Sequence, residues 1–249
     1  ALARSAEAVK EIEGDGVGNF STQEGAMNGS PTGELPPATD RMRTKHMTEQ
    51  QILAADLVGE IHVDAALWAC TTCGACDYHC PVFIEHVNPI LEMRRHLVLE
   101  QEGRFPKELQ TLFRGLETQA NPWGLGAHTR LDWAAGLNVP TIEDNPDAEY
   151  LYYVGCFGSF DSRSKPTSVA IIELPNAAGI SYAVMAQETC NGDPARRSGN
   201  EYLAQMLAEQ VIDNLKEIKP RKVITQFPHC FNAFKNEYPD NGFVFEEVI

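Results

Sequence analysis

The run Cys70-Thr-Thr-Cys73-Gly-Ala-Cys76-Asp-Tyr-His-Cys80-Pro81 decides how the first half of this chain is expected to fold. Its four cysteines follow the spacing C-x2-C-x2-C-x3-C-P, which is a ligand pattern for iron–sulfur clusters. The two-residue gaps allow the thiolates of Cys70, Cys73 and Cys76 to bind successive corners of one cubane. We therefore predict that these three cysteines hold a [4Fe-4S] cluster.

Cys80 is expected to have a different role from its three neighbours. It follows Cys76 too closely to complete the same cluster easily, and in two-cluster ferredoxins the fourth cysteine of such a run binds the other cluster. The other ligands of that second cubane would then lie outside this sequence. Zinc is the alternative metal because C-x2-C also builds zinc ribbons, although zinc sites usually use two separated cysteine pairs.

The composition limits the possible classes of protein. The chain has 249 residues, is 43% hydrophobic and carries a net charge of −15, which argues against nucleic acid as a partner. It contains no apolar stretch of transmembrane length and no signal-peptide pattern. Because it does not begin with Met, we expect a processed or partial chain. The seven cysteines are typical of metal ligands in a reducing compartment.

The sequence predicts four segments. Residues 1–40 are rich in Gly, Ser, Thr and Pro and are expected to form a flexible arm. Residues 41–120 are predicted to form a helical, ferredoxin-like [4Fe-4S] module, with helices at 49–60, 63–69, 88–101 and 106–117. Thr48 and Gln51 form a capping box for the first helix. Residues 121–148 form a connection rich in Gly and Pro.

Residues 149–249 are predicted to form an α/β domain with a parallel sheet, because strands alternate with helices. Asp193 and Pro194 are expected to start a long helix as N-cap and first helical residue. The apolar face of that helix is expected to be Leu203, Met206, Leu207, Val211 and Leu215. The predicted strands are 149–155, 181–185 and 222–227, and the predicted helices are 165–178, 194–216 and 231–237.

The three remaining cysteines indicate a second site. Cys156, Cys190 and Cys230 each follow a predicted strand, in segments interpreted as polar loops. Ligands of open parallel sheets gather at the carboxyl ends of the strands, so we expect the three thiols to converge there. The alternative is three unrelated core cysteines.

Several long motifs carry a family resemblance. The segments Tyr153-Val-Gly-Cys-Phe-Gly-Ser-Phe-Asp161, Glu188-Thr-Cys-Asn-Gly-Asp-Pro-Ala-Arg-Arg-Ser-Gly-Asn-Glu201 and Pro228-His-Cys-Phe-Asn232 resemble the cysteine-rich (CCG) domain of heterodisulfide-reductase-like iron–sulfur oxidoreductases. Leu67-Trp-Ala-Cys-Thr-Thr-Cys-Gly-Ala-Cys76 and Asn121-Pro-Trp-Gly124 are similar to the same proteins. The resemblance covers about 48–249 and extends to the D-type subunits and the electron-transfer-flavoprotein:menaquinone oxidoreductases.

The resemblance implies an iron–sulfur electron-transfer subunit. It implies two cubane clusters in the ferredoxin part and a non-cubane [4Fe-4S] cluster or related site in the CCG part, bound by Cys156, Cys190 and Cys230. The expected partners are a soluble donor, such as a flavoprotein or a thiol/disulfide couple, and a membrane subunit or quinone system. The expected location is cytoplasmic, on the inner face of the membrane. The alternatives are the iron–sulfur subunit of a glycolate or lactate oxidase and a zinc-stabilised interaction module without redox function.

The chain departs from the family pattern in three ways. Asn191 follows Cys190 where the family often has a second cysteine, and Phe227 stands where the family usually has the first cysteine of Cys-Pro-His-Cys. An earlier cysteine run and a second CCG copy are also missing. The first two departures remove thiolates from the second site, so a full non-cubane cluster is not expected on this chain alone. The missing second copy indicates that 149–249 is the first CCG copy, truncated before the second.

Other residues have both a functional and an ordinary interpretation. His79 and His229 could contact a thiolate or could be loop histidines satisfied by backbone. Arg196 and Arg197 could offset cluster charge or form exposed ion pairs. The three tryptophans, Trp68, Trp123 and Trp133, are expected to pack rather than relay electrons, and Met206 is expected to be core.

Overall fold

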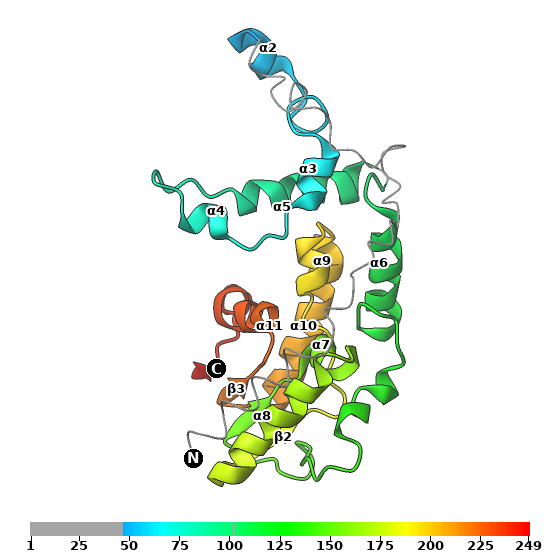
Figure 1. Cartoon of the computed structure of the whole chain (residues 1–249), viewed down its shortest axis with the longest axis vertical. Helices are drawn as coiled ribbons and strands as arrows, with labels where there is room; N and C mark the ends of the chain where they lie inside the picture. Colours follow the sequence, from blue (N-terminus) through cyan, green and yellow to red (C-terminus); the bar gives the residue numbers. More distant parts are fainter. Residues whose placement is uncertain (1–46, 102) are drawn as a thin grey trace, which may run out of the picture. The chain divides into compact units, whose positions relative to one another are not determined.

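The computed structural model describes residues 47–101 and 103–249, which belong to one compact unit, Met42–Ile249. The predicted arm, 1–40, lies outside the described residues. Figure 1 shows short helices in the first part of the described chain and a small sheet covered by helices in the second. The predicted mixed α/β architecture is therefore confirmed for the second part.

The first part contains the predicted helices, with some changes in length. The capping box of Thr48 and Gln51 starts α2, but that helix ends after six residues instead of continuing to 60. The remaining elements lie close to the predicted boundaries, and a short α4 follows the turn at Gly74. Their bounds are α2 Glu49–Ala54, α3 Asp64–Ala69, α4 Ala75–Tyr78, α5 Val87–Arg95, the π-helix His96–Glu100 and α6 Lys107–Gln119. These helices do not by themselves establish a ferredoxin module, which remains a prediction.

The second part is built on a four-stranded parallel sheet. The strands are β1 Tyr150–Tyr152, β2 Tyr182–Val184, β3 Lys222–Ile224 and β4 Glu247–Val248, in the order β2-β1-β3-β4. Three strands were predicted, with longer bounds. β4 was missed because its two residues give too little periodicity to detect.

Helices cover both faces of this sheet, as an all-parallel sheet requires. Tyr152 and Val184 pack on α8, Lys165–Ala178, and on Trp133 from the preceding connection. Leu151 and Val223 face the opposite way, toward α10, Glu201–Ile218, and the π-helix Ala233–Glu237. Alternate residues of each short strand therefore belong to two separate clusters of buried side chains.

The predicted long helix at 194–216 is two helices. It divides into α9, Asp193–Arg197, and α10, with a break at Ser198–Asn200. Gly199 has a φ of 84°, and Asn200 caps α10 by accepting a hydrogen bond from the Leu203 N–H. Asp193 is the first residue of α9, whereas Gly192 is its N-cap, so the predicted cap was one residue late.

Two side-chain predictions can be assessed in this region. Leu203, Leu207, Val211 and Leu215 are buried, as their helical spacing predicts. Met206 is 43% exposed, so the expectation that it is core was wrong. It lies at the edge of the apolar face of α10, next to the solvent-exposed face of the helix.

Candidate functional site

The first cysteine run lies on a short helix–turn–helix segment. Cys70 caps the end of α3, Gly74 has a left-handed backbone that starts α4, and Cys76 lies within α4. Cys80 follows that helix, and α5 begins shortly afterwards. The run is therefore a continuous local structure in which Cys73 and Cys76 are exposed and Cys70 and Cys80 are partly buried.

Backbone N–H groups point at three of these four sulfur atoms. The Thr72 N–H donates to Cys70 Sγ at 3.3 Å, and the Ile84 N–H donates to Cys80 Sγ at 3.2 Å. A hydrogen bond from the Ala75 N–H lowers the pKa of the Cys73 thiol. Donors of this kind stabilise a thiolate or a cluster sulfur, so the backbone of the run fits a thiolate-bound group.

The second set of cysteines surrounds one cavity. Cys156, Cys190 and Cys230 are all buried, and all three line a cavity of about 250 Å³. The structure therefore brings together three residues that are far apart in the sequence, at the place where the sequence predicts convergence.

The elements that carry these cysteines differ in part from the prediction. Cys190 precedes α9 in a loop, as expected, but Cys156 lies in α7, Gly155–Phe160, and Cys230 lies in α11, Pro228–Asn232. Both helices begin directly after a strand. The chain leaves β1 for β2 on one side and later returns to β3 on the other, so the carboxyl ends of β1 and β3 form a topological switch point. Cys156 and Cys230 lie at this point.

Gly155 allows two of the sulfur-bearing helices to meet closely. Its φ is 73°, and a Cβ atom at this position would lie 3.2 Å from Cys230 Sγ. A residue with a side chain would be strained and would press on that thiol. The glycine before Cys156 is therefore required by the approach of α7 to Cys230.

A buried ion pair contacts the segment that carries Cys156, one of the residues lining the cavity. Arg130 donates to Glu188 at 2.7 Å, and both side chains are almost fully buried. Glu188 also accepts hydrogen bonds from the N–H groups of Val154 and Gly155, at 2.8 and 2.9 Å. The Arg130 guanidinium lies 3.5 Å from Cys156 Sγ, so a positive charge contacts the thiol site.

The three buried thiols have different acidities. A hydrogen bond from Cys190 and the charge of Arg130 lower the pKa of Cys156, against the effect of burial. The same hydrogen bond together with burial raises the pKa of Cys190, and burial raises that of Cys230. Among these three thiols, Cys156 is therefore the one whose thiolate form the surroundings favour.

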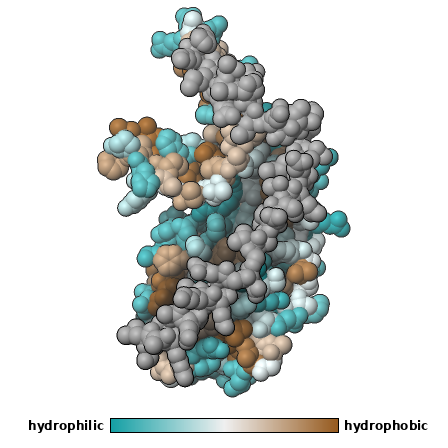
Figure 2. Space-filling view, viewed as in Figure 1, coloured by the Kyte–Doolittle hydropathy of each residue, from teal (hydrophilic) through white to brown (hydrophobic). Residues whose placement is uncertain are grey.

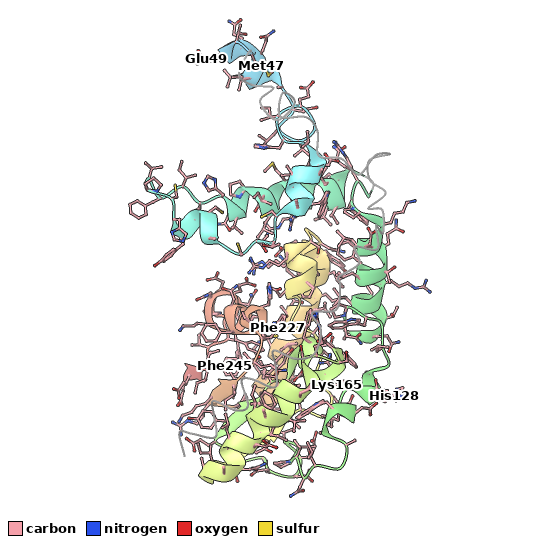
Figure 3. All side chains as sticks on the ribbon, in the orientation of Figure 1. Met47, Glu49, His128, Lys165, Phe227 and Phe245 are labelled. Carbon is pink, nitrogen blue, oxygen red and sulfur yellow. The ribbon has the colours of Figure 1, made fainter. Side chains whose placement is uncertain are left out.

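The two departures from the family pattern have structural roles. Asn191 is buried, its side-chain oxygen accepts from the Asp193 N–H at 3.1 Å, and its amide nitrogen has no hydrogen-bond partner among the described residues. Phe227 stacks on Phe157 with ring centroids 4.3 Å apart. Both residues line the cavity, and Phe227, labelled in Figure 3, is half-buried just before α11.

The polar rim of the cavity is a connected set of ion pairs. His229 Nδ1 lies 2.9 Å from Asp193, and Arg197 contacts both Asp193 and Glu237. The hydrogen bond that His229 donates to Asp193 raises the pKa of His229. His229 therefore contacts a carboxylate and lines the cavity, which differs from a histidine satisfied by backbone. Arg196 also forms an ion pair with Glu237, at 2.9 Å.

The first cysteine run contributes to the same cavity. Thr71 and Thr72, which lie between Cys70 and Cys73, line it together with Arg94 and the three buried cysteines. The first run therefore reaches the cavity through Thr71 and Thr72, whereas its four cysteines are not among the lining residues. Across the described residues, no three Cys, His, Asp or Glu side chains are already arranged to hold a metal ion.

Comparison with known proteins agrees with this geometry. Residues 150–235 match the family model described as "CCG: Cysteine-rich domain". This region is a CCG domain. It includes β1, β2 and β3 and all three cysteines of the cavity. No solved structure matches the chain.

Relatives of the chain are named as iron–sulfur and quinone oxidoreductases. It is 41% identical over 195 residues to the probable iron-sulfur-binding oxidoreductase FadF of Bacillus subtilis, covering 75% of this chain and 28% of that protein. It is 43% identical over 199 residues to the EtfAB:quinone oxidoreductase of Syntrophomonas wolfei, covering 78% and 27%. One component of the dihydromethanophenazine:CoB–CoM heterodisulfide reductase of Methanosarcina mazei is 27% identical over 175 residues, covering 68% and 41%.

These matches confirm the resemblance to heterodisulfide-reductase-like iron–sulfur oxidoreductases with a CCG domain. The chain spans less than a third of the length of the first two relatives. The described residues contain no helix with the length and apolar character needed to span a bilayer.

Sequence reasoning missed the charged residues that hold the site together. Arg130 lies in the segment interpreted as a plain connection, and Glu188 was noted only as part of a motif. Their roles depend on a contact across 58 positions, which no local pattern reveals. The only available signal was the presence of a glutamate two residues before Cys190.

Proposed function

We propose that this chain is part of an iron–sulfur oxidoreductase that passes electrons between a soluble redox partner and a membrane quinone system. The observation that carries the proposal is the shared cavity, in which residues of the first cysteine run and the three CCG cysteines line the same walls. Electron transfer requires redox groups to lie close together with little rearrangement between them. Thr71 and Thr72, between Cys70 and Cys73, bring the first run to the cavity that the three CCG cysteines line, which supports such an arrangement.

At the first site, Cys70, Cys73 and Cys76 would hold a [4Fe-4S] cluster, with the backbone donors of Thr72 and Ala75 directed at sulfur. Such a cluster supplies one-electron chemistry and forms no bond to substrate. Cys80 would be a ligand of a second cubane whose other cysteines belong to a different segment or chain. Its surroundings support an interface, since Tyr78, Val82 and Phe83 are strongly exposed. Figure 2 shows hydrophobic surface in this part of the molecule.

At the second site, Cys156, Cys190 and Cys230 would hold a cluster or a related metal group. The fit rests on three buried thiols, on the Arg130 charge beside Cys156 and on the unpartnered amide nitrogen of Asn191, which can donate to an anionic group. Phe227 cannot donate to a metal, so the fourth position would be open or taken by His229 or solvent. We expect this site to lose its metal more easily than the first.

The names of the relatives indicate which redox partners to expect for this chain, and these partners are part of the proposal. One relative is named an EtfAB:quinone oxidoreductase and another a probable membrane-anchored ferredoxin. By analogy, the donor would be a flavoprotein and the acceptor a quinone system, and the chain would act on the inner face of the membrane.

The test is anaerobic reconstitution of the chain with iron and sulfide, followed by metal analysis and EPR of the reduced protein. Cys73→Ser should remove or strongly alter the signal of the first cluster, whereas Cys230→Ser should leave that signal intact and release only metal bound in the CCG domain. A colourless protein that binds zinc in preference to iron would refute the proposal. An unchanged signal with full iron content in Cys73→Ser would refute the ligand assignment.

A further inference from the structure

Arg94 joins the first cysteine run to the CCG domain. It lies on α5 and is only 5% exposed. Its guanidinium donates to the carbonyl oxygens of Leu67, at 2.5 and 3.1 Å, and Cys70, at 2.5 Å, which flank the start of the cysteine run. It also donates to the carbonyl oxygen of Arg197 in α9, at 2.7 Å.

This guanidinium is a buried positive charge that backbone carbonyl oxygens hold in place. Among the residues that the structure describes, no Asp or Glu forms an ion pair with Arg94, and its other neighbour is the ring of Trp68, 5.2 Å from the guanidinium carbon. Two neighbouring arginines have such a partner: the half-buried Arg197, which also lines the cavity, pairs with Asp193, and Arg130, beside Cys156, pairs with Glu188. A charge buried without a counter-ion is costly, so an anionic group is expected beside it.

A second observation shows that this junction is tight. Gly199, in the break between α9 and α10, has a φ of 84°, and a Cβ atom there would lie 2.5 and 2.6 Å from the backbone carbon and oxygen of Arg94. The backbone of α5 therefore rests directly on the CCG domain at the residue that carries the guanidinium. This contact fixes the position of the charge relative to Cys70.

We propose that Arg94 is a positioning residue that holds the Cys70 end of the cysteine run on α9 and supplies the counter-charge for the cluster bound there. The inference rests on the proposed function, because the anion it calls for is the thiolate-bound cluster of Cys70, Cys73 and Cys76. When that cluster takes up one electron from a reductant, its negative charge increases by one. The fixed guanidinium stabilises the more negative, reduced form and so raises the reduction potential.

The experiment is an EPR-monitored potential titration of the reconstituted full chain with dithionite as reductant. Arg94→Gln should lower the midpoint potential of the first cluster, corresponding to about a tenfold loss in the stability of the reduced form, or about 59 mV for one electron. Arg94→Lys, which keeps the charge but not the fork of donors, should restore most of the potential. Arg114→Gln is the control, because Arg114 is an exposed arginine on α6 and its replacement removes the same charge.

The outcomes separate this inference from the proposed function. A wild-type chain without a reduced-cluster signal would overturn the proposed function itself. A normal signal whose potential is the same in Arg94→Gln and Arg114→Gln would overturn only the role of Arg94. If Arg94→Gln loses its cluster, the Arg94→Lys variant provides the test. A wild-type midpoint potential in Arg94→Lys supports the charge assignment. A midpoint potential lowered by about 59 mV in that variant refutes it.

Discussion

Removal of the Glu188 carboxylate should strongly destabilise the CCG domain. In Glu188→Ala, Arg130 loses its buried ion-pair partner, and the N–H groups of Val154 and Gly155 lose their acceptor. Breaking a buried pair by removing one partner typically costs about 3–5 kcal/mol. Arg130 would retain the Ala120 carbonyl oxygen at 3.3 Å and the Cys156 sulfur at 3.5 Å. We therefore expect a loss near the lower end, about 3 kcal/mol.

Two further variants test the reason for that loss. Glu188→Gln keeps the shape and one acceptor oxygen, so it should cost about 1–2 kcal/mol. Arg130→Met leaves Glu188 with its two backbone donors and should fall between the other two variants. The matched control is Glu246→Ala, because Glu246 pairs with Arg221 at 2.8 Å, nearly the same distance, but both side chains are more than half exposed. That variant should leave stability unchanged, since solvent screens an exposed pair.

The assay is urea unfolding of the reduced, metal-free chain, followed by circular dichroism and by fluorescence in a background in which Trp68→Phe and Trp123→Phe leave Trp133 as the emitting tryptophan. Trp133 is buried against Tyr152 on the face of the sheet, so its emission reports this core. A loss of about 3 kcal/mol corresponds to a decrease in Tm of roughly 6–12 °C for a chain of this size. If Glu188→Ala costs less than about 1 kcal/mol with an unchanged m-value, the pair does not support the domain as argued.

Three other variants test other parts of the molecule. Cys80→Ser should leave the iron content of the reconstituted single chain unchanged, whereas loss of its only cluster would show that Cys80 belongs to the same cubane as Cys76. Phe227→Cys should increase iron retention by the CCG site while lowering stability by roughly 2 kcal/mol through loss of the stack on Phe157, and unchanged iron would exclude position 227 as a ligand site. Gly199→Ala should destabilise the chain by about 1–3 kcal/mol more than Gly179→Ala, because both glycines have positive φ but only a Cβ at 199 meets another backbone. Equal urea midpoints for the two glycine variants would show that α5 moves away without cost.

The sequence predicted the elements whose signals are local. The capping box at Thr48, the apolar face of α10 and the alternation of strands with helices all appear in the structure. Convergence of the three CCG cysteines could also be predicted, because parallel strands place their carboxyl ends at one edge. Each of these inferences needs only a few neighbouring residues or the direction of the strands.

The failures arise where tertiary contacts override local patterns. The helix predicted over 194–216 is broken at Gly199, where α5 of the first part packs too closely to allow a side chain. Met206 has helical spacing but lies at the edge of the face, where burial depends on the neighbouring helix. Cys156 was assigned to a loop because Gly155 suggested one, whereas that glycine starts α7. None of these contacts is encoded within a short window of sequence.

The substitutions at Asn191 and Phe227 change the character of the CCG site without dismantling it. Asn191 fixes the turn into α9 through its side-chain oxygen, and Phe227 builds an aromatic wall with Phe157. Three thiols and one amide donor remain around the cavity, and the Arg130 guanidinium lies beside Cys156, so the site keeps a donor set for an anionic metal group but offers one open position. The first cysteine run borders this open side through Thr71 and Thr72. The arrangement therefore favours electron exchange between two proposed sites across one cavity, with Arg94 fixing the distance between them.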